Sequence, residues 1–148
     1  MKQAIAFVAG FISCMLLVCA IGWLAAVRAD DFLVATCCSY HFERKGYNER
    51  NYGLGLEHSI SRDCRLLAGF YDNSLYRQTV YAGAVYAPLR TGQWHFGAVM
   101  GVFTGYAPQP EPLAAPVLMW EGEHLGVNLL VIPIPQGLVG AQLKWRFE

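Results

Sequence analysis

Charge is the first thing that this sequence has little of. Only 15% of its 148 residues are Asp, Glu, Lys or Arg, and the 11 acidic side chains cancel the 11 basic ones. Nowhere do Lys and Arg gather into the basic surface that neutralises nucleic-acid phosphates, so we expect no nucleic-acid partner. A chain of this length forms one domain.

Cysteine pairs with metal-ligand spacing are also missing. After residue 30 the cysteines are Cys37, Cys38 and Cys64, without a CxxC pair or a His/Cys pattern typical of zinc sites. We therefore expect no metal and no cofactor. Adjacent strand residues point to opposite faces, so at most one of Cys37 and Cys38 can face Cys64. Small apolar packing residues are the simplest interpretation of all three.

Residues 1–29 have the pattern of an export signal rather than of a folded domain. Lys2 precedes an apolar run of about 24 residues, and Val27 and Ala29 fit a signal-peptidase site. This predicts a signal peptide over 1–29 and a β-barrel domain over 30–148. Because the run is long enough to span a bilayer, an uncleaved N-terminal membrane segment is the alternative.

Helical patterns of useful length are absent after Asp30, and extended runs take their place. These runs are rich in Val, Leu, Tyr, Phe and Trp and are separated by Gly, Asn, Asp and Pro. They cover residues 33–42, 51–60, 65–72, 79–88, 94–104, 114–121, 124–132 and 138–147. An even number of strands closes without a free edge, which predicts an all-β fold, an eight-stranded antiparallel up-and-down transmembrane β-barrel.

The last run carries the membrane signal. Apolar residues from Val139 to Phe147 alternate with polar residues or glycine, as in a strand that separates lipid from a barrel lumen. The alternation ends on the penultimate residue, as bacterial outer-membrane barrels habitually do, so we expect the bacterial outer membrane. A soluble lipocalin-like barrel held by an N-terminal helix is an alternative, but its exterior would be polar.

One rim of such a barrel gathers the residues that can do chemistry. Every odd strand runs outward, so His41 shares the outer rim with Asp72, Asn73 and Ser74. Acyl transfer needs a base, a group that orients it and donors for the oxyanion. His41 can be the base, Asp72 its orienting carboxylate and Ser74 a nucleophile or oxyanion donor, with Asn73 as a further donor. A polar rim that merely faces water is the alternative.

Other features concern a lipid substrate. The run 79–88 is apolar on both faces, which predicts a partly apolar lumen with space for side chains or one slim ligand. Pro116 and Pro133 cannot donate to a strand ladder, which predicts a gap between the sixth and seventh strands, or simply the ends of those strands. Arg50 and Arg77 can grip lipid phosphates or belong to solvated loops.

Taken in order, these motifs resemble the outer-membrane lipid A palmitoyltransferases, the PagP-type barrels. The likeness spans roughly residues 39–147. It rests on His41, Tyr47-Asn48-Glu49-Arg50, Phe70-Tyr71-Asp72-Asn73-Ser74, Ala82-Gly83, Trp94-His95-Phe96-Gly97, Pro112-Leu113, Pro116-Val117-Leu118, Ile132-Pro133 and Trp145-Arg146-Phe147.

The resemblance implies an enzyme that moves an acyl chain from phospholipid to lipid A. Its catalytic His falls on His41 and its Asp on Asp72, whereas its Ser matches Ser74 only if Asn73 is an insertion. Val85 stands near the glycine that sets acyl length in the family, so we expect a shallower lumen and a shorter acyl chain. The family's amphipathic N-terminal helix is missing.

Two functions follow from these residues. One is an outer-membrane acyltransferase whose partners are phospholipid and lipid A. The other is a non-catalytic small outer-membrane barrel that binds lipid or has a structural role. In either case we expect a monomer that depends on the barrel-assembly machinery during its biogenesis.

Overall fold

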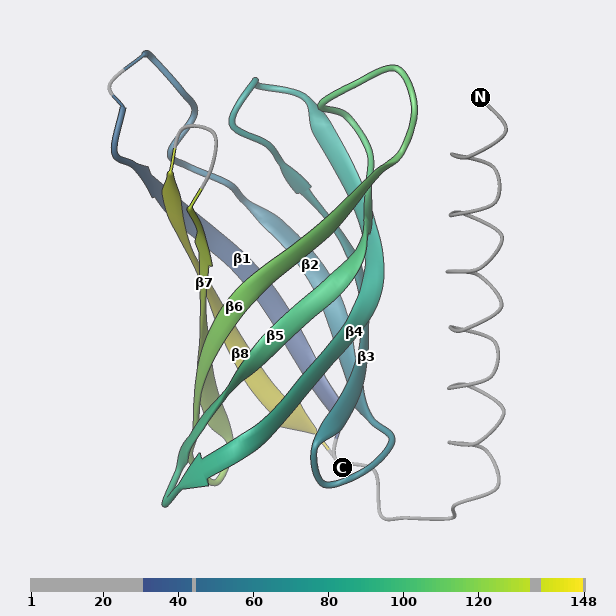
Figure 1. The fold of residues 1–148 in the computed structure, drawn as a ribbon, viewed down its shortest axis with the longest axis vertical. Helices are drawn as coiled ribbons and strands as arrows, with labels where there is room; N and C mark the ends of the chain where they lie inside the picture. Colours follow the sequence, from purple (N-terminus) through teal and green to yellow (C-terminus); the bar gives the residue numbers. More distant parts are fainter. Residues whose placement is uncertain (1–30, 44, 134–136, 148) are drawn as a thin grey trace.

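The computed structural model describes residues 31–43, 45–133 and 137–147, so the predicted signal peptide lies outside the described residues. The described chain forms eight antiparallel strands that pair in chain order and close into a barrel (Figure 1). They are β1 (Asp31–His41), β2 (Gly53–Ser59), β3 (Cys64–Asp72), β4 (Gln78–Thr91), β5 (Trp94–Phe103), β6 (Glu111–Glu121), β7 (Leu125–Ile132) and β8 (Leu138–Phe147). The predicted eight-stranded up-and-down barrel is confirmed.

Prolines account for the main differences from the predicted strand bounds. β4 continues past residue 88 to Thr91, because the β4–β5 register shifts between Tyr86 and Leu89 and so accommodates Pro88. β6 begins at Glu111, before its two prolines, and pairs with β5 along its whole length. Proline therefore ends neither of these strands.

Large apolar side chains cover the outside of the barrel. The exposed ones on the strands include Leu33, Leu54, Leu56, Phe70, Val80, Leu89, Phe96, Met100, Leu125, Val131 and Leu143, with Trp94 and Trp145. A water-exposed protein rarely presents so extensive an apolar surface, whereas a lipid-facing belt consists of such residues. This exterior argues against the soluble lipocalin-like alternative. None of the described residues forms a helix long and apolar enough to cross a membrane.

We call the rim that holds Asp31 and the end of β8 the inner end, and the rim that holds His41 the outer end. The lumen changes character between them. Near the inner end, Glu57, Arg65 and Lys144 are buried with Glu121 in ion pairs. Toward the middle lies an apolar cluster of Val85, Ala87, Val99, Ala115, Val117 and Met119. A cavity and a histidine lie beyond this cluster, toward the outer end.

Candidate functional site

The structure brings His41 and Ser74 together. His41 is the last residue of β1, and Ser74 lies in the turn between β3 and β4. The Nε2 atom of His41 is 2.8 Å from the Oγ atom of Ser74, and both residues are buried. The imidazole also stacks on Tyr47, with ring centroids 4.6 Å apart. This is the arrangement that a base needs toward a hydroxyl.

Asp72 does not reach the imidazole. Its neighbour Tyr71 lines the lumen, so the pleat of β3 turns the Asp72 side chain to the exposed side. The main chain of Asp72 bonds to Asn51 and Tyr52 instead. The Nδ1 atom of His41, where an orienting carboxylate would bind, is buried without a hydrogen-bond partner among the described residues.

Glu49 is a carboxylate that does lie beside His41. The His41 main-chain N–H donates to Glu49 Oε1 at 3.4 Å, and Ser39 N–H donates to the Glu49 main-chain oxygen at 3.0 Å. The carboxylate near His41 therefore comes from the first outer loop and not, as the sequence had predicted, from β3. Glu49 belongs to the Tyr47 to Arg50 motif, in which the sequence predicts a role only for Arg50.

Asn73 organises the turn that presents Ser74. Its side-chain Nδ2 donates to Thr79 Oγ1 at 3.1 Å and to the Gly105 oxygen at 3.2 Å. Its Oδ1 accepts from the main-chain N–H groups of Leu75 and Arg77. The residue is fully buried. Its amide is occupied within the protein, so the residue that interrupts the Asp-Ser motif shapes the turn that brings Ser74 to His41.

Arg50 and Arg77 lie on the outer loops near this pair. Both are exposed, and the N–H of Arg50 is held by Asn48 Oδ1 at 3.0 Å. Asn48 also donates to the main-chain oxygen of Asn73, which ties the first outer loop to the β3–β4 turn. These bonds hold the backbone that carries Arg50 and Arg77 close to the His41–Ser74 pair.

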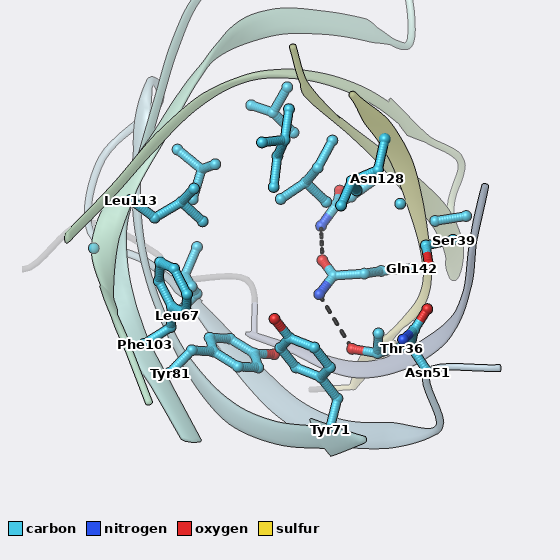
Figure 2. Close-up of a pocket in the computed structure, with 18 of the residues that line it drawn as sticks. Thr36, Ser39, Asn51, Leu67, Tyr71, Tyr81, Phe103, Leu113, Asn128 and Gln142 are labelled. Carbon is cyan, nitrogen blue, oxygen red and sulfur yellow. Dashed lines mark hydrogen bonds between the residues drawn. The ribbon is translucent and has the colours of Figure 1, made fainter. Parts of the chain in front are cut away.

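A cavity of about 120 Å³ has Ser74 among its lining residues. Figure 2 shows this cavity inside the barrel. One wall is polar, because Asn128 donates to Gln142 at 3.4 Å and Gln142 donates to Thr36 at 3.3 Å. The opposite wall is apolar and includes Leu67, Phe103 and Leu113, as Figure 2 shows. The lining also includes Val85, Val99 and Val117. Val85 thus lies where the cavity meets the apolar cluster of the barrel middle.

The barrel wall beside this cavity is not fully paired. The β6–β7 ladder runs only from Val117↔Leu130 to Glu121↔Gly126. Farther outward, residues 111–116 of β6 pair only with β5, and Val131 and Ile132 of β7 pair only with β8. Pro116 and Pro133 lie exposed on this stretch. The two prolines therefore stand where the predicted gap between β6 and β7 begins.

Metal-binding residues do not cluster in the described chain: no three His, Cys, Asp or Glu side chains gather within ligating range there. The three described cysteines are free thiols, with Cys38 exposed and the other two half-buried.

Comparison with known proteins supports the fold. No family model matches the sequence, and no curated protein matches it. Two de novo designed transmembrane β-barrels match with TM-scores of 0.62 and 0.60 and sequence identities of 10% and 15%. The matches cover 80% and 81% of this chain and 95% and 94% of the designs.

A natural structure also matches. The outer membrane protein Ail of Yersinia pestis, solved in a phospholipid bilayer nanodisc, aligns with a TM-score of 0.50 at 9% identity. The match covers 81% of this chain and 100% of that one. At such identities the likeness concerns the fold, and it agrees with the apolar exterior. The chain has the fold of a small transmembrane β-barrel.

Proposed function

We propose that this protein is a bacterial outer-membrane acyltransferase that moves an acyl chain from a phospholipid to lipid A or a related acceptor. The observation that carries the proposal is the buried His41–Ser74 pair at the mouth of a largely apolar cavity. A hydroxyl within reach of an imidazole can be activated for attack on an ester, and the cavity offers the acyl chain a place.

In the proposed reaction, His41 Nε2 takes the proton of the Ser74 hydroxyl as Oγ attacks the ester carbonyl of the phospholipid. The bond from the carbonyl carbon to the glycerol oxygen breaks, His41 returns the proton to that oxygen, and lysophospholipid leaves. A hydroxyl of the acceptor then attacks the acyl-serine by the same proton route. If Ser74 instead donates to the oxyanion, His41 takes the proton of the acceptor hydroxyl directly.

The surroundings of the pair support a lipid substrate. The unpaired stretch at Pro116 and Pro133 lies beside cavity-lining residues of β6 and β7, so an acyl chain can enter from the bilayer sideways. Arg50 and Arg77 are exposed on the same rim, where guanidinium groups bind phosphate in a bidentate manner. Phospholipid and lipid A are therefore the proposed partners.

The size of the cavity favours a short acyl chain. Its volume is about 120 Å³. An apolar cavity of about 150 Å³ takes up a molecule the size of benzene. We propose that Val85, which is 2% exposed at the floor, limits the depth to which an acyl chain can enter.

The test is mass spectrometry of lipid A and phospholipids from outer membranes with and without expression of the protein, beside His41→Ala and Ser74→Ala. We expect an acyl-length mass gain on lipid A that His41→Ala abolishes while the barrel remains heat-modifiable on electrophoresis. Loss with Ser74→Ala supports the nucleophile, and partial retention supports the oxyanion donor. A gain that survives His41→Ala would refute the assignment.

One observation favours a second function. Asp72 points away from His41, and His41 Nδ1 has no partner among the described residues, so the pair lacks the orienting contact expected of a base. A non-catalytic barrel that holds a lipid in the same cavity fits this geometry. Two results would support it. The lipid A and phospholipid pools would be unchanged, and the amount of lipid that co-purifies with the protein would be lower for Val85→Phe.

A further inference from the structure

A second cavity, of about 570 Å³, lies at the inner end of the lumen, opposite the His41–Ser74 pair. It is bounded by the connections between β2 and β3, β4 and β5, and β6 and β7, together with the end of β8. We call it the inner vestibule. Its lining contains four arginines, Arg62, Arg65, Arg90 and Arg146, but only two acidic residues, Glu121 and Glu123.

Ion pairs within the protein neutralise only part of this positive charge. Arg65 donates to Glu57 and to both carboxylate oxygens of Glu121. Lys144 contacts the same two glutamates, so these four charges balance. Outside this set, Arg90 lies 3.2 Å from Asp63.

Arg62 and Arg146 remain without a carboxylate partner in the described part of the chain. Arg62 is exposed at the mouth of the vestibule. The guanidinium of Arg146 is held over the Phe32 ring, 5.0 Å from its centroid. Phe32 is fully buried, so this guanidinium has a defined position, and it has no carboxylate counter-ion among the described residues.

Three buried nitrogens of the vestibule lack hydrogen-bond partners among the described residues, and one of them, Arg90 Nε, has the Asp63 carboxylate 3.2 Å away. The other two are the Nε atom of Arg146 and the Nδ1 atom of His95. His95 is 7% exposed, and its other nitrogen lies 3.9 Å from Glu121. The Nε–H of Arg146 is always a donor, whereas the Nδ1 of His95 donates in one of its tautomers. A polar group buried without a partner costs free energy, and nearly all such groups in native proteins have one. Both residues line one positively charged cavity, which points to an acceptor that arrives from outside.

We propose that the inner vestibule binds a phosphate-type oxyanion, with Arg146 and His95 donating to it and Arg62 closing the mouth. A tetrahedral oxyanion carries several acceptors, matches the guanidinium fork and supplies the missing negative charge. A free phosphate and the phosphodiester of a lipid headgroup share this chemistry. The site does not depend on the proposed acyl transfer, because the ion-paired residues Glu57, Arg65, Glu121 and Lys144 lie between it and the outer cavity.

The experiment uses the full barrel in octyl glucoside, a detergent without phosphate, and inorganic phosphate as the probe. Binding is followed by the ¹H–¹⁵N signals of the arginine Nε–H groups. We expect a saturable shift at Arg146 and binding roughly tenfold weaker in Arg146→Gln, the loss of one charge-assisted contact. Arg62→Gln should also weaken binding. Lys45→Gln, which removes one charge at the outer end, is the matched control and should bind as the parent does.

A second arm distinguishes the sources of the anion. Short-chain phosphatidylglycerol is titrated in the same detergent, beside a diacylglycerol of equal chain length that lacks the phosphate. Saturation by inorganic phosphate identifies a free-anion site, and saturation by phosphatidylglycerol alone identifies a headgroup site. No saturation by either, or binding that Arg146→Gln and Arg62→Gln leave intact, overturns the proposal. His41→Ala should keep the anion binding, which separates this result from failure of the proposed acyl transfer.

Discussion

The inner and outer halves of the barrel lumen are filled differently. In the inner half, Glu57, Arg65, Glu121 and Lys144 bond to one another, and Phe32 packs under Arg65 and Lys144. In the outer half a cavity remains open, and polar atoms stay unpaired. The four buried charges of the inner half are neutralised within the chain, whereas the outer half keeps an open, largely apolar cavity.

The unpaired atoms of the outer half lie close to the cavity or the histidine. They include Ser39 Oγ, Asn51 Oδ1 and His41 Nδ1. Ser39 and Asn51 also line the cavity. Buried groups without partners lower stability, and they concentrate where a ligand or a reaction uses them. We therefore expect the ion-paired set of the inner half to contribute most to stability, and the outer half to carry the proposed acyl transfer.

We expect the largest loss of unfolding free energy from Lys144→Met, which removes one charge of the inner ion-paired set. Lys144 is 1% exposed and contacts Glu57 and Glu121. Its loss leaves buried carboxylates short of positive charge, which costs about 3–5 kcal/mol when one partner of a buried pair is removed. Urea unfolding in lipid vesicles, followed by tryptophan fluorescence, measures the loss.

The matched control for Lys144→Met is Gln142→Met, two residues earlier on the same face of β8 and in the outer half. Gln142 makes two long hydrogen bonds, at 3.3 and 3.4 Å. We expect it to cost less than about 1.5 kcal/mol, the net value of a typical hydrogen bond. Equal losses from the two variants would show that the halves do not differ in the way described.

Val85→Gly tests the boundary between the two halves. Removing this buried side chain should cost about 1.5–3 kcal/mol in unfolding free energy. It should also deepen the outer cavity, because Val85 lines it. If the protein transfers acyl groups, the preferred chain should lengthen, as read by mass spectrometry of the products. An unchanged product profile would sink the idea that Val85 limits the depth.

Comparing Glu49→Gln with Asp72→Asn tests which of the two carboxylates supports His41 as a base. Glu49 lies beside His41, whereas the Asp72 side chain is exposed. We expect Glu49→Gln to lower acyl transfer about tenfold, equivalent to about 1.4 kcal/mol, and Asp72→Asn to leave it nearly unchanged. Initial rates with a fluorescent phospholipid donor measure both. The opposite ranking would restore Asp72 to the role that the sequence predicted.

We expect the smallest change in unfolding free energy from a substitution in a turn. Tyr76, in the outer β3–β4 turn, has a φ of 59°, whereas the inner β4–β5 hairpin places Gly92 at a φ of 57°. A tyrosine is strained in this left-handed region and glycine is not. Tyr76→Gly should therefore stabilise the barrel by about 0.5 kcal/mol, as measured by the urea midpoint. A destabilisation of similar size would show that the Tyr76 side chain contributes more than its strained backbone costs.

Strand number and order, and the strand bounds to within a few residues, followed from the sequence because each depends on local signals. Alternation of apolar residues, turn residues at short intervals and an even number of runs are enough to predict a closed meander. The shared outer rim of His41 and Ser74 followed from the same count. The end of β4 did not, because the strand continues past Pro88 only through a bulge in β4, which the sequence does not reveal.

The assignment of roles within the rim depended on tertiary structure. Whether Asp72 or Ser74 faces His41 is decided by the parity of the pleat and by the turn that Asn73 builds. Glu49 reaches His41 only because the first outer loop folds back over β1. Neither result follows from residue spacing along the chain.

The sequence by itself determined a closed barrel with an apolar exterior, because turn positions and the alternation of apolar residues within each strand are local patterns. Only the tertiary structure decided that Glu57, Arg65, Glu121 and Lys144, from four different strands, meet in the lumen. Their meeting depends on the relative register of those strands, and a shift of one residue would turn each side chain to the other face of the wall. That register divides the lumen into an ion-paired inner half and an outer cavity beneath the His41–Ser74 pair.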